Sequence, residues 1–340
     1  MASPLKRIDV HNHVCPAELL QAVRNAPQRF GMRVEGEGEG LRVVRPDTRH
    51  AFAIVPELHD PKAKLEGLDR RGIDAAFISP GPMFFFYWLA ADAGLEAARL
   101  INEGIAKMTA YDPQRLLGMG TLPMQDPDAA VAELERVVRQ YGWRAIEIGT
   151  EVGTGQIADP RFRKLLRRAQ ELKVFLFAHP MSFTPLCAGL GQYHLNNLIG
   201  NPLASTVMAA HLMFSGALDE LRELKICLAH GGGFLPYQIG RFAHGHRVRK
   251  DVSADTPTSP YELLRRFYFD ALTHDAQALR FLIDQVGADR VTLGTDAPYD
   301  MAEDHPLETL GKVRGLTEAE REQVCCRTAL ELMGAPYYSE

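Results

Sequence analysis

The stretch Ile8-Asp9-Val10-His11-Asn12-His13 places two histidines two residues apart in a β-like segment near the start of the chain. Side chains of a strand point alternately to its two faces, so His11 and His13 share one face and Ile8 and Val10 the other. If the apolar pair packs outward against helices, the two imidazoles point inward and can bind one ion. Alone, the pair is a weak signal, because two surface or hydrogen-bonded histidines give the same pattern.

Short apolar runs of this kind recur along the whole chain and alternate with longer segments that have helical spacing. The eight predicted strands are Arg7–His13, Asp74–Ser79, Leu116–Leu122, Ala145–Thr150, Val174–His179, Lys225–His230, Phe267–Ala271 and Val291–Asp296. Repeated strand–helix alternation favours parallel strands, and eight units fit a closed barrel better than an open sheet. We therefore predict an α/β fold, a (β/α)8 TIM barrel; a doubly wound sheet with a helical tail is the competing architecture.

Local signals mark several of the helices. Apolar residues between Val131 and Tyr141 recur on one helical face. Asp126-Pro127 and Asp159-Pro160 each place a favourable N-cap residue before a proline at the first helical position. Thr317 with Glu320 three residues later has the spacing of a capping box. These signals support helices between the predicted strands and a helical tail after the last one.

We assign residues 1–340 to a single barrel domain with two additions. An inserted flap occupies about 16–56, after the first strand, and a helical tail begins at about 316. The flap contains the glycine-rich run Gly36–Gly40, which is not a dinucleotide fingerprint because no strand leads into it and no helix follows. We expect this flap to cover the mouth of the barrel.

Composition excludes several classes of partner. The net charge is −5 and no basic run occurs, so neither nucleic acid nor an anionic membrane surface is an expected partner. The longest strongly apolar run, Met83–Ala91, is far shorter than the roughly 18 residues of a membrane span. The five cysteines are odd in number and form no CxxC pair. With no secretory h-region in Met1–Val10, we predict a cytoplasmic protein without a disulfide framework.

Polar residues also stand at the ends of later strands. His179 ends the fifth predicted strand, His230 the sixth and Asp296 the eighth, each as the first strongly polar side chain after an apolar run. Barrel enzymes place their catalytic groups at this carboxyl-terminal face. Together with the first-strand histidine pair, these positions are too many to explain as core filling. The pattern predicts a metal site for one divalent ion.

The residue types suit particular metals. Neutral imidazoles combined with one carboxylate fit Zn²⁺ best, with Mn²⁺, Fe²⁺ and Co²⁺ as alternatives. A metal in such a site lowers the pKa of a bound water toward neutrality. One histidine must then move protons, because the ordinary imidazole pKa lies close to operating pH.

The order of these residues resembles the signature of the amidohydrolase superfamily over nearly the whole chain. The phrases Lys225-Ile-Cys-Leu-Ala-His-Gly-Gly-Gly, with Gly240-Arg241 after it, and Val291-Thr-Leu-Gly-Thr-Asp-Ala-Pro are similar to one branch. That branch contains 2-amino-3-carboxymuconate-6-semialdehyde decarboxylase, γ-resorcylate decarboxylase and related aromatic-acid decarboxylases. The resemblance implies a metal-dependent carboxy-lyase that acts without oxidation on an aromatic or conjugated unsaturated acid.

The resemblance also implies roles for individual residues. Four residues would hold the metal, namely His11, His13, His179 and Asp296. His230 would handle the proton. Arg241 and Arg49 would bind the substrate carboxylate. Asp296 counts as catalytic as well as metal-binding. Arg241 would reach the site of a neighbouring subunit, which implies a homodimer, and Arg49 would come from the flap.

Two other classes of function remain open. The fourth strand, Ala145–Thr150, lacks the lysine that bridges two metals in many hydrolases of the superfamily, which favours one metal. A mononuclear hydrolase of a C–N, C–O or C–C bond would nevertheless use the same residues. The chain contains no G-x-S-x-G elbow, so we exclude a serine hydrolase. A non-catalytic metal-binding protein is the third class, and it predicts tight metal binding without turnover.

Overall fold

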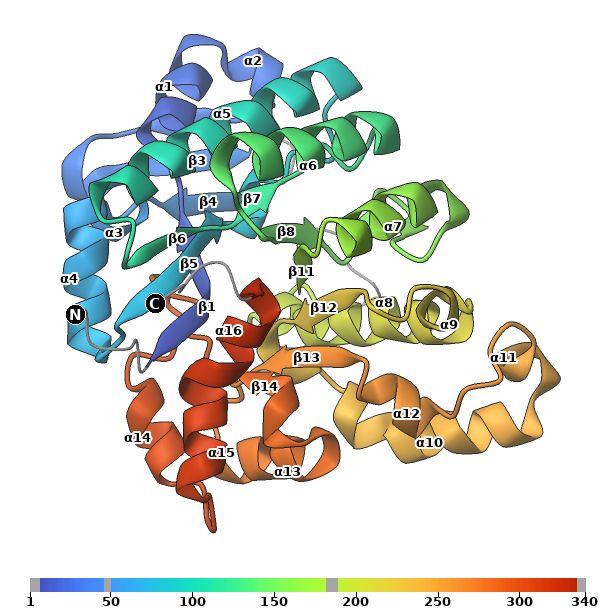
Figure 1. Cartoon of the computed structure of the whole chain (residues 1–340). Coiled ribbons are helices and arrows are strands. Elements are labelled where there is room, and N and C mark those ends of the chain that lie inside the picture. The colour runs from blue at the N-terminus through green and yellow to red at the C-terminus, as the bar shows by residue number, and fades with distance from the viewer. Residues whose placement is uncertain (1–6, 46–49, 182–188, 335–340) are drawn as a thin grey trace.

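The computed structural model describes residues 7–45, 50–181 and 189–334. Parallel strands occupy the centre and helices lie around them (Figure 1). The central strands are β1 (Ile8–Val14), β5 (Ala75–Pro80), β6 (Leu116–Gly118), β7 (Gly120–Thr121), β8 (Ala145–Gly149), β11 (Phe175–His179), β12 (Lys225–Leu228), β13 (Phe267–Asp270) and β14 (Val291–Thr292). Each of the eight predicted strands is present, the third as the pair β6 and β7.

Hydrogen bonds close these strands into a barrel. The strands form two runs, β1-β5-β6 and β14-β13-β12-β11-β8-β7, and β6 and β7 are separated by one residue, Met119. Met119 N–H donates to the carbonyl oxygen of Ile78 at 3.1 Å and so continues the pairing with β5. At the other edge, Val10 N–H donates to Leu293 O at 3.0 Å and His13 N–H to Ala297 O at 2.8 Å. The predicted TIM barrel is therefore confirmed over an open sheet.

Two strands end more than one residue earlier than predicted, and the polar residue predicted as the last of each has an unusual backbone conformation. The sixth strand stops at Leu228 and the eighth at Thr292, short of the predicted His230 and Asp296. His230 and Asp296 have φ of 56° and 61°, in the left-handed region that strands do not adopt. Neither polar residue can therefore belong to a strand, and both lie in the loops that follow β12 and β14.

The principal barrel helices are α4 (Pro61–Arg71), α5 (Ala91–Tyr111), α6 (Pro127–Tyr141), α7 (Arg163–Glu171), α8 (Asn201–Phe214), α10 (Leu235–Val248) and α13 (Ala276–Val286). The remaining helices are α1 (Ala17–Asn25), α2 (Pro27–Phe30), α3 (Pro56–His59), α9 (Ala217–Glu220), α11 (Lys250–Ser253), α12 (Pro260–Leu264), α14 (Pro306–Gly311), α15 (Glu318–Glu322) and α16 (Thr328–Met333). None of the helices in the described ranges is both long and apolar enough to span a membrane.

The helix signals were mostly right. Asp126 caps α6 by accepting bonds from the N–H groups of the next two non-proline residues, and Thr317 and Glu320 form the predicted capping box. Asp159 instead precedes a 3-10 turn, Pro160–Phe162, and its carboxylate accepts from Gln156 N–H. A good N-cap residue before proline therefore did not guarantee an α-helix, because a second local partner was available.

The segment between β1 and α4 contains a small antiparallel sheet of its own. After α1 and α2 come β2 (Arg33–Glu35), β3 (Arg42–Arg45) and β4 (His50–Ala53), paired in that order. The Gly36–Gly40 run connects β2 to β3 and contains a 3-10 turn. The guanidinium of Arg45 lies 3.7 Å from the ring centroid of Trp88, which follows β5, and attaches the sheet to the loop after that strand.

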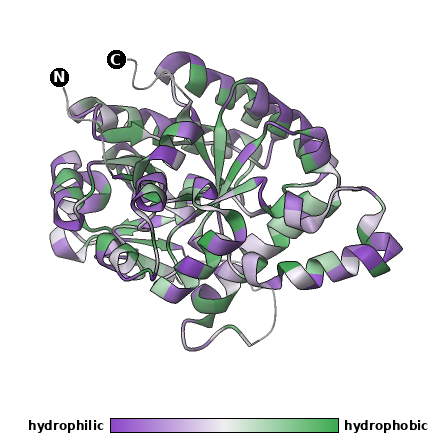
Figure 2. Cartoon of the chain, turned by 60° about the horizontal axis from the view of Figure 1, so that its bottom comes forward, coloured by the Kyte–Doolittle hydropathy of each residue, from purple (hydrophilic) through white to green (hydrophobic). Residues whose placement is uncertain are grey.

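An apolar core fills the amino-terminal part of the barrel, and the central strands are largely coloured as hydrophobic in Figure 2. Phe77 and Phe175 come from strands that are not neighbours, yet their rings meet edge to face at 5.4 Å inside the barrel. Ile8 and Val10 belong to the same buried cluster, so the expectation that they point outward is wrong. Leu332 of α16 also joins it, which places the tail helix over this end of the barrel.

A bulge in β1 explains the orientation of these side chains. Asp9 pairs with Ala76 but Asn12 pairs with Ile78, so three residues of β1 face two of β5. The extra residue breaks the alternation of faces. It allows Ile8 and Val10 to fill the core while His11 and His13 still face the interior near the carboxyl-terminal end.

Candidate metal centre and active site

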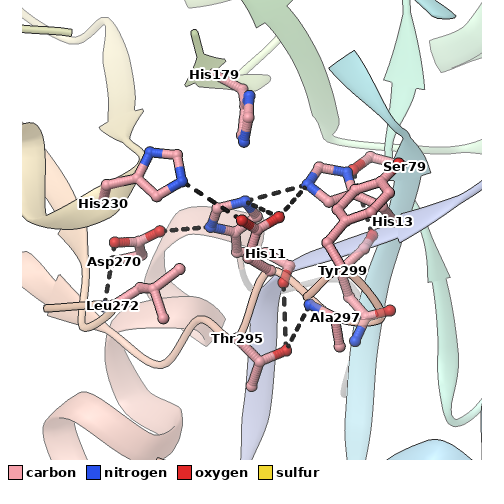
Figure 3. A network of polar contacts seen from close by, with 12 residues as sticks. His11, His13, Ser79, His179, His230, Asp270, Leu272, Thr295, Ala297 and Tyr299 are labelled. Atoms are coloured by element: carbon pink, nitrogen blue, oxygen red, sulfur yellow. Dashed lines mark hydrogen bonds and ion pairs between the residues drawn. The ribbon is translucent and has the colours of Figure 1, made fainter. Parts of the chain in front are cut away.

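The four predicted histidines meet at the carboxyl-terminal end of the barrel (Figure 3), and Asp296 lies among them. One ligand atom from each of His11, His179, His230 and Asp296 lies within 4.8 Å of the others. His13 joins them, since its Nε2 lies 3.0 Å from Asp296 Oδ1 and 3.1 Å from His11 Nε2. These side chains come from β1, from the end of β11 and from the loops after β12 and β14, so closure of the barrel is what assembles the cluster.

The outer nitrogens of three imidazoles have acceptors of their own. His11 Nδ1 lies 2.6 Å from Asp270 Oδ2, His13 Nδ1 lies 3.2 Å from Pro80 O, and His179 Nδ1 lies 2.7 Å from Pro180 O. Because an Nδ1–H donates in each case, the Nε2 atom keeps its lone pair. The lone pairs of His11 and His13 face Asp296 Oδ1, at 3.3 Å and 3.0 Å.

This arrangement fits a cation. Two imidazole nitrogens 3.1 Å apart and a carboxylate oxygen 3.3 Å from His11 Nε2 repel one another unless positive charge lies between them. The buried Nε2 of His179 has no hydrogen-bond partner among the residues that the structure describes. Three imidazoles and one carboxylate are also a donor set that Zn²⁺, Mn²⁺, Fe²⁺ and Co²⁺ accept. The donor set of these side chains thus fits a divalent ion.

The pKa values of the clustered side chains in the metal-free chain also indicate that the cluster favours a positive charge. Burial would lower the pKa of His11, but the charge of Asp296 and the bond to Asp270 outweigh it and raise that pKa to about 10. Burial lowers the pKa of His13 to about 4 against the pull of Asp296. The pKa of Asp296 lies well below its usual range because the charge of His11 outweighs burial. A proton on His11 therefore replaces the ion when no metal is bound.

Asp270 is a functional residue that the sequence analysis missed. It ends β13, and its Oδ1 accepts the N–H groups of Gly231 at 2.8 Å and Leu272 at 3.2 Å, while Oδ2 faces His11. One carboxylate thus orients His11 and also fixes the backbone that follows His230. The signal was available, because Asp270 is the one charged residue of the predicted strand Phe267–Ala271 and lies next to its carboxyl-terminal end.

A buried network behind β1 was also missed. Lys64 of α4 is completely buried and donates to Asn12 Oδ1 at 2.6 Å and to His13 O at 2.8 Å. Asn12 Nδ2 donates to Asp9 Oδ2 at 2.9 Å, and Thr295 Oγ1 donates to the same oxygen at 2.6 Å. These bonds hold the bulged strand against the turn that carries Asp296. A lysine on a polar helix gives no sequence signal of burial.

The fourth strand presents Glu147 to the interior in place of a lysine. Glu147 is completely buried and its Oε1 lies 3.9 Å from His13 Nδ1. Burial raises the pKa of this carboxyl group well above its usual value. Glu147 is accordingly a buried neighbour of His13 on the fourth strand.

A cavity of about 490 Å³ opens beside the cluster, and its wall separates the roles of the histidines. This volume is typical of a site for a small organic ligand. His230 and Asp296 line it together with the apolar side chains of Leu272, Leu282 and Met301. Among the described residues, His11, His13 and His179 do not line the cavity. His230 therefore faces the cavity, whereas the other three imidazoles do not contribute to its described wall.

The two predicted arginines have different outcomes. Arg241 lies on α10, is exposed to solvent and is absent from the described wall of the cavity in its own chain. Arg49 lies outside the described residues. Arg45 is the neighbouring arginine of the insertion that the structure does describe, and its side chain is only 5% exposed.

The comparisons with known proteins identify the family. The amidohydrolase family model matches residues 8–335, which is nearly the entire chain. The chain belongs to this family, as the order of its polar residues predicted.

Its named relatives are decarboxylases. The chain is 30% identical to 2-amino-3-carboxymuconate-6-semialdehyde decarboxylase of Dictyostelium discoideum over 333 residues, 96% of this chain and 91% of the relative. It is 30% identical to γ-resorcylate decarboxylase of Rhizobium sp. (strain MTP-10005) over 287 residues, 79% of this chain and 84% of the relative. These names agree with the predicted carboxy-lyase branch rather than with the hydrolase alternative.

Solved structures share the fold. 5-Carboxyvanillate decarboxylase from Sphingomonas paucimobilis superposes with a TM-score of 0.81 at 22% identity, covering 97% of this chain and 99% of that chain. A dihydroxybenzoic acid decarboxylase from Polaromonas sp. JS666, which holds bound manganese and an inhibitor, gives 0.77 at 23% identity with 97% coverage of both chains. At these identities the likeness extends to the fold alone.

Proposed function

We propose that this chain is a metal-dependent carboxy-lyase that removes CO2, without oxidation, from an aromatic or conjugated unsaturated carboxylic acid. The metal ligands are His11, His13, His179 and Asp296. Support comes from the lone pairs that converge on Asp296 and from the decarboxylase names of the relatives. The small carboxylate substrate occupies the cavity that His230 lines.

Zinc is the ion that we propose first, because histidine-rich sites with one carboxylate suit it. Manganese is the alternative that a similar solved structure supports, since that structure contains manganese. Bound among these residues, a divalent ion would polarise an oxygen atom of the substrate or of water. The buried bonds from Asp270, Pro80 and Pro180 keep the three imidazoles oriented for this purpose.

The position of His230 is the observation that carries the proposed reaction. His230 lines the cavity, and its Nε2 lies 3.6 Å from Asp296 Oδ2. His230 gives its proton to the carbon that bears the carboxylate, and a C–H bond forms there. The C–C bond to the carboxylate then breaks, CO2 leaves, and the electron pair of that bond restores the conjugated system.

Several further features belong to the same proposal. Arg241, which is exposed on α10, would reach the cavity of a second subunit in a homodimer. Arg49 would contribute to carboxylate binding from the insertion. The chain functions as one domain in the cytoplasm. Light scattering tests the dimer directly, and a monomer at working concentration removes the role of Arg241 in a partner site.

The test combines elemental analysis of purified protein with a CO2-release screen over aromatic and unsaturated acids. We expect about one transition-metal ion per chain and CO2 in step with loss of substrate. Turnover in ¹⁸O-labelled water separates the two enzyme classes, because a decarboxylase places no solvent oxygen in the organic product and a hydrolase does. Solvent oxygen in the product would establish the hydrolase, and metal without turnover on any acid would favour a binding protein.

A further inference from the structure

His274 lies on the cavity wall with an unusual backbone conformation and an imidazole that has no partner in the described ranges. It lines the cavity, is exposed to solvent and has φ of 54°, a conformation that side-chain-bearing residues rarely adopt. Within the described part of the chain its imidazole makes no hydrogen bond, ion pair or ring contact. A strained position that holds an unpartnered donor toward a cavity points to a ligand rather than to folding.

The same strain recurs at the two reactive residues of this cavity. Seven described residues other than glycine have positive φ, and three of them, His230, His274 and Asp296, line this one cavity. His230 and Asp296 end the sixth and eighth predicted strands, and His274 belongs to the loop after the seventh. Three consecutive barrel loops thus use the same backbone conformation to present a polar side chain to one space.

Local bonds hold the turn that carries His274. Leu272 N–H donates to Asp270 Oδ1 at 3.2 Å, and Thr273 N–H donates to Ala271 O at 2.9 Å. On the other side, Thr273 Oγ1 donates to the carbonyl oxygen of Asp275 at 3.0 Å, and the Asp275 side chain caps α13 through Ala278 N–H at 2.8 Å. The backbone of the turn is fixed at both ends, so the position of His274 on the cavity wall is set before a ligand binds.

The few basic side chains that line the cavity indicate a specific role for His274. No lysine or arginine occurs among the described residues that line the cavity. His230 is committed to proton transfer next to Asp296. Apart from it, His274 is the lining side chain among these residues that can carry positive charge, and the wall beside it includes the amide of Asn197. An oxygen acceptor on a ligand would find its hydrogen-bond donor here.

We propose that His274 is a specificity-determining residue that donates a hydrogen bond to a second oxygen-bearing group of the substrate, away from the carboxylate that leaves. The inference deepens the proposed decarboxylase function and rests on it. It narrows the substrate class to aromatic or conjugated acids that carry a second acceptor, such as a further carboxylate. An acid with one carboxylate and no other acceptor leaves this donor unused.

The experiment measures binding of non-reacting probes to the metal-loaded protein by calorimetry. Benzoate is compared with isophthalate and terephthalate, and with their mono-carboxamides, which separate a charged acceptor from a neutral one. His274→Gly removes the imidazole and suits the positive φ, because glycine adopts it freely. His194→Gly is the matched control, since His194 is exposed, has φ of 57° and does not line the cavity.

We expect at least one dicarboxylate to bind the wild type about 10- to 100-fold more tightly than benzoate, the range of one charge-assisted hydrogen bond. H274G should remove that preference and leave benzoate affinity unchanged, while H194G keeps it. His274→Asn, which tolerates positive φ and keeps a donor, should restore part of it. Equal binding of all probes, no measurable binding up to about 10 mM, which corresponds to a very weak complex, or a preference that survives in H274G would overturn the proposal.

Failure here is distinguishable from failure of the proposed function. CO2 release by the wild type tests the carboxy-lyase, and it does not depend on the dicarboxylate preference. For the acid that the screen identifies, H274G should raise KM with kcat nearly unchanged, because the contact lies away from the bond that breaks. A fall in kcat at unchanged KM would instead assign His274 to the chemical step and refute the specificity role.

Discussion

Replacing Asp270 with asparagine tests the reasoning about imidazole orientation most directly. The new side chain would keep one carbonyl oxygen for the N–H groups of Gly231 and Leu272, which Asp270 Oδ1 now accepts at 2.8 Å and 3.2 Å. Its amide N–H2 would then face His11 Nδ1, where a carboxylate oxygen lies at 2.6 Å in the wild type. Two donors cannot face each other, so His11 is driven to the tautomer that carries its proton on Nε2.

The expected magnitude follows from the bond that is lost. A hydrogen bond between an imidazole and a charged carboxylate contributes about 1.5–3 kcal/mol. Since about 1.4 kcal/mol corresponds to a tenfold change, metal affinity should fall about 10- to 100-fold. Independent experience with outer ligands of metal-bound histidines gives the same range, about 10- to 100-fold.

The assay is competition for the metal with a chelator of known affinity, followed by elemental analysis of the protein. Asp289→Asn is the matched control, because Asp289 is half exposed and pairs with Arg265 near the surface at 3.2 Å. Thermal unfolding of the metal-free variants checks that the fold persists. Unchanged metal affinity in D270N, or an equal loss in D289N, would refute the link between Asp270 and the tautomer of His11.

Three further predictions concern proton transfer, packing and pH. His230→Gln should lower CO2 release at least about 100-fold with metal content unchanged, and near-wild-type turnover would contradict its role. Lys64→Met should lower the free energy of unfolding in urea by about 3 kcal/mol, because Asn12 Oδ1 and the carbonyl oxygen of His13 lose their donor; a loss below about 0.5 kcal/mol would contradict this. For metal-free protein, burial opposes but Asp296 raises the pKa of His11 from 6.5 to about 10, so its charged form stabilises the fold fully below pH 6.5 and this contribution disappears as pH rises to 10. The difference in unfolding free energy between wild type and His11→Asn should shrink over that interval, and a constant difference would show that His11 does not hold this proton.

The sequence was sufficient for the architecture because strands and helices leave local periodic patterns. All eight strands, the capped helix α6 and the tail with its capping box could be predicted from spacing alone. The five central polar residues could also be found, because each follows or ends an apolar strand. Parallel strands of a barrel bring those ends to one face, so a local signal at each strand became a three-dimensional prediction.

What the sequence could not give depends on contacts between distant segments. The bulge that sends Ile8 and Val10 into the core has no composition signal, since it arises from the register between β1 and β5. The burial of Lys64 depends on how α4 docks behind β1. Each feature requires knowing which surfaces meet, and alternation within one strand does not carry that information.

The different roles of the residues in the cluster also could not be assigned from the sequence alone. Sequence placed five polar residues at one end of the barrel, and the resemblance to the amidohydrolase superfamily suggested their roles. Only the tertiary structure shows that His230 faces the cavity while His13 is completely buried. Likewise, the roles of Asp270 and His274 depend on residues distant in the sequence. Asp270 contacts His11, and His274 lines a cavity whose wall also includes Asn197 and Met301. Residue type and spacing determine which chemistry is available, and closure of the barrel decides which atoms face the ligand.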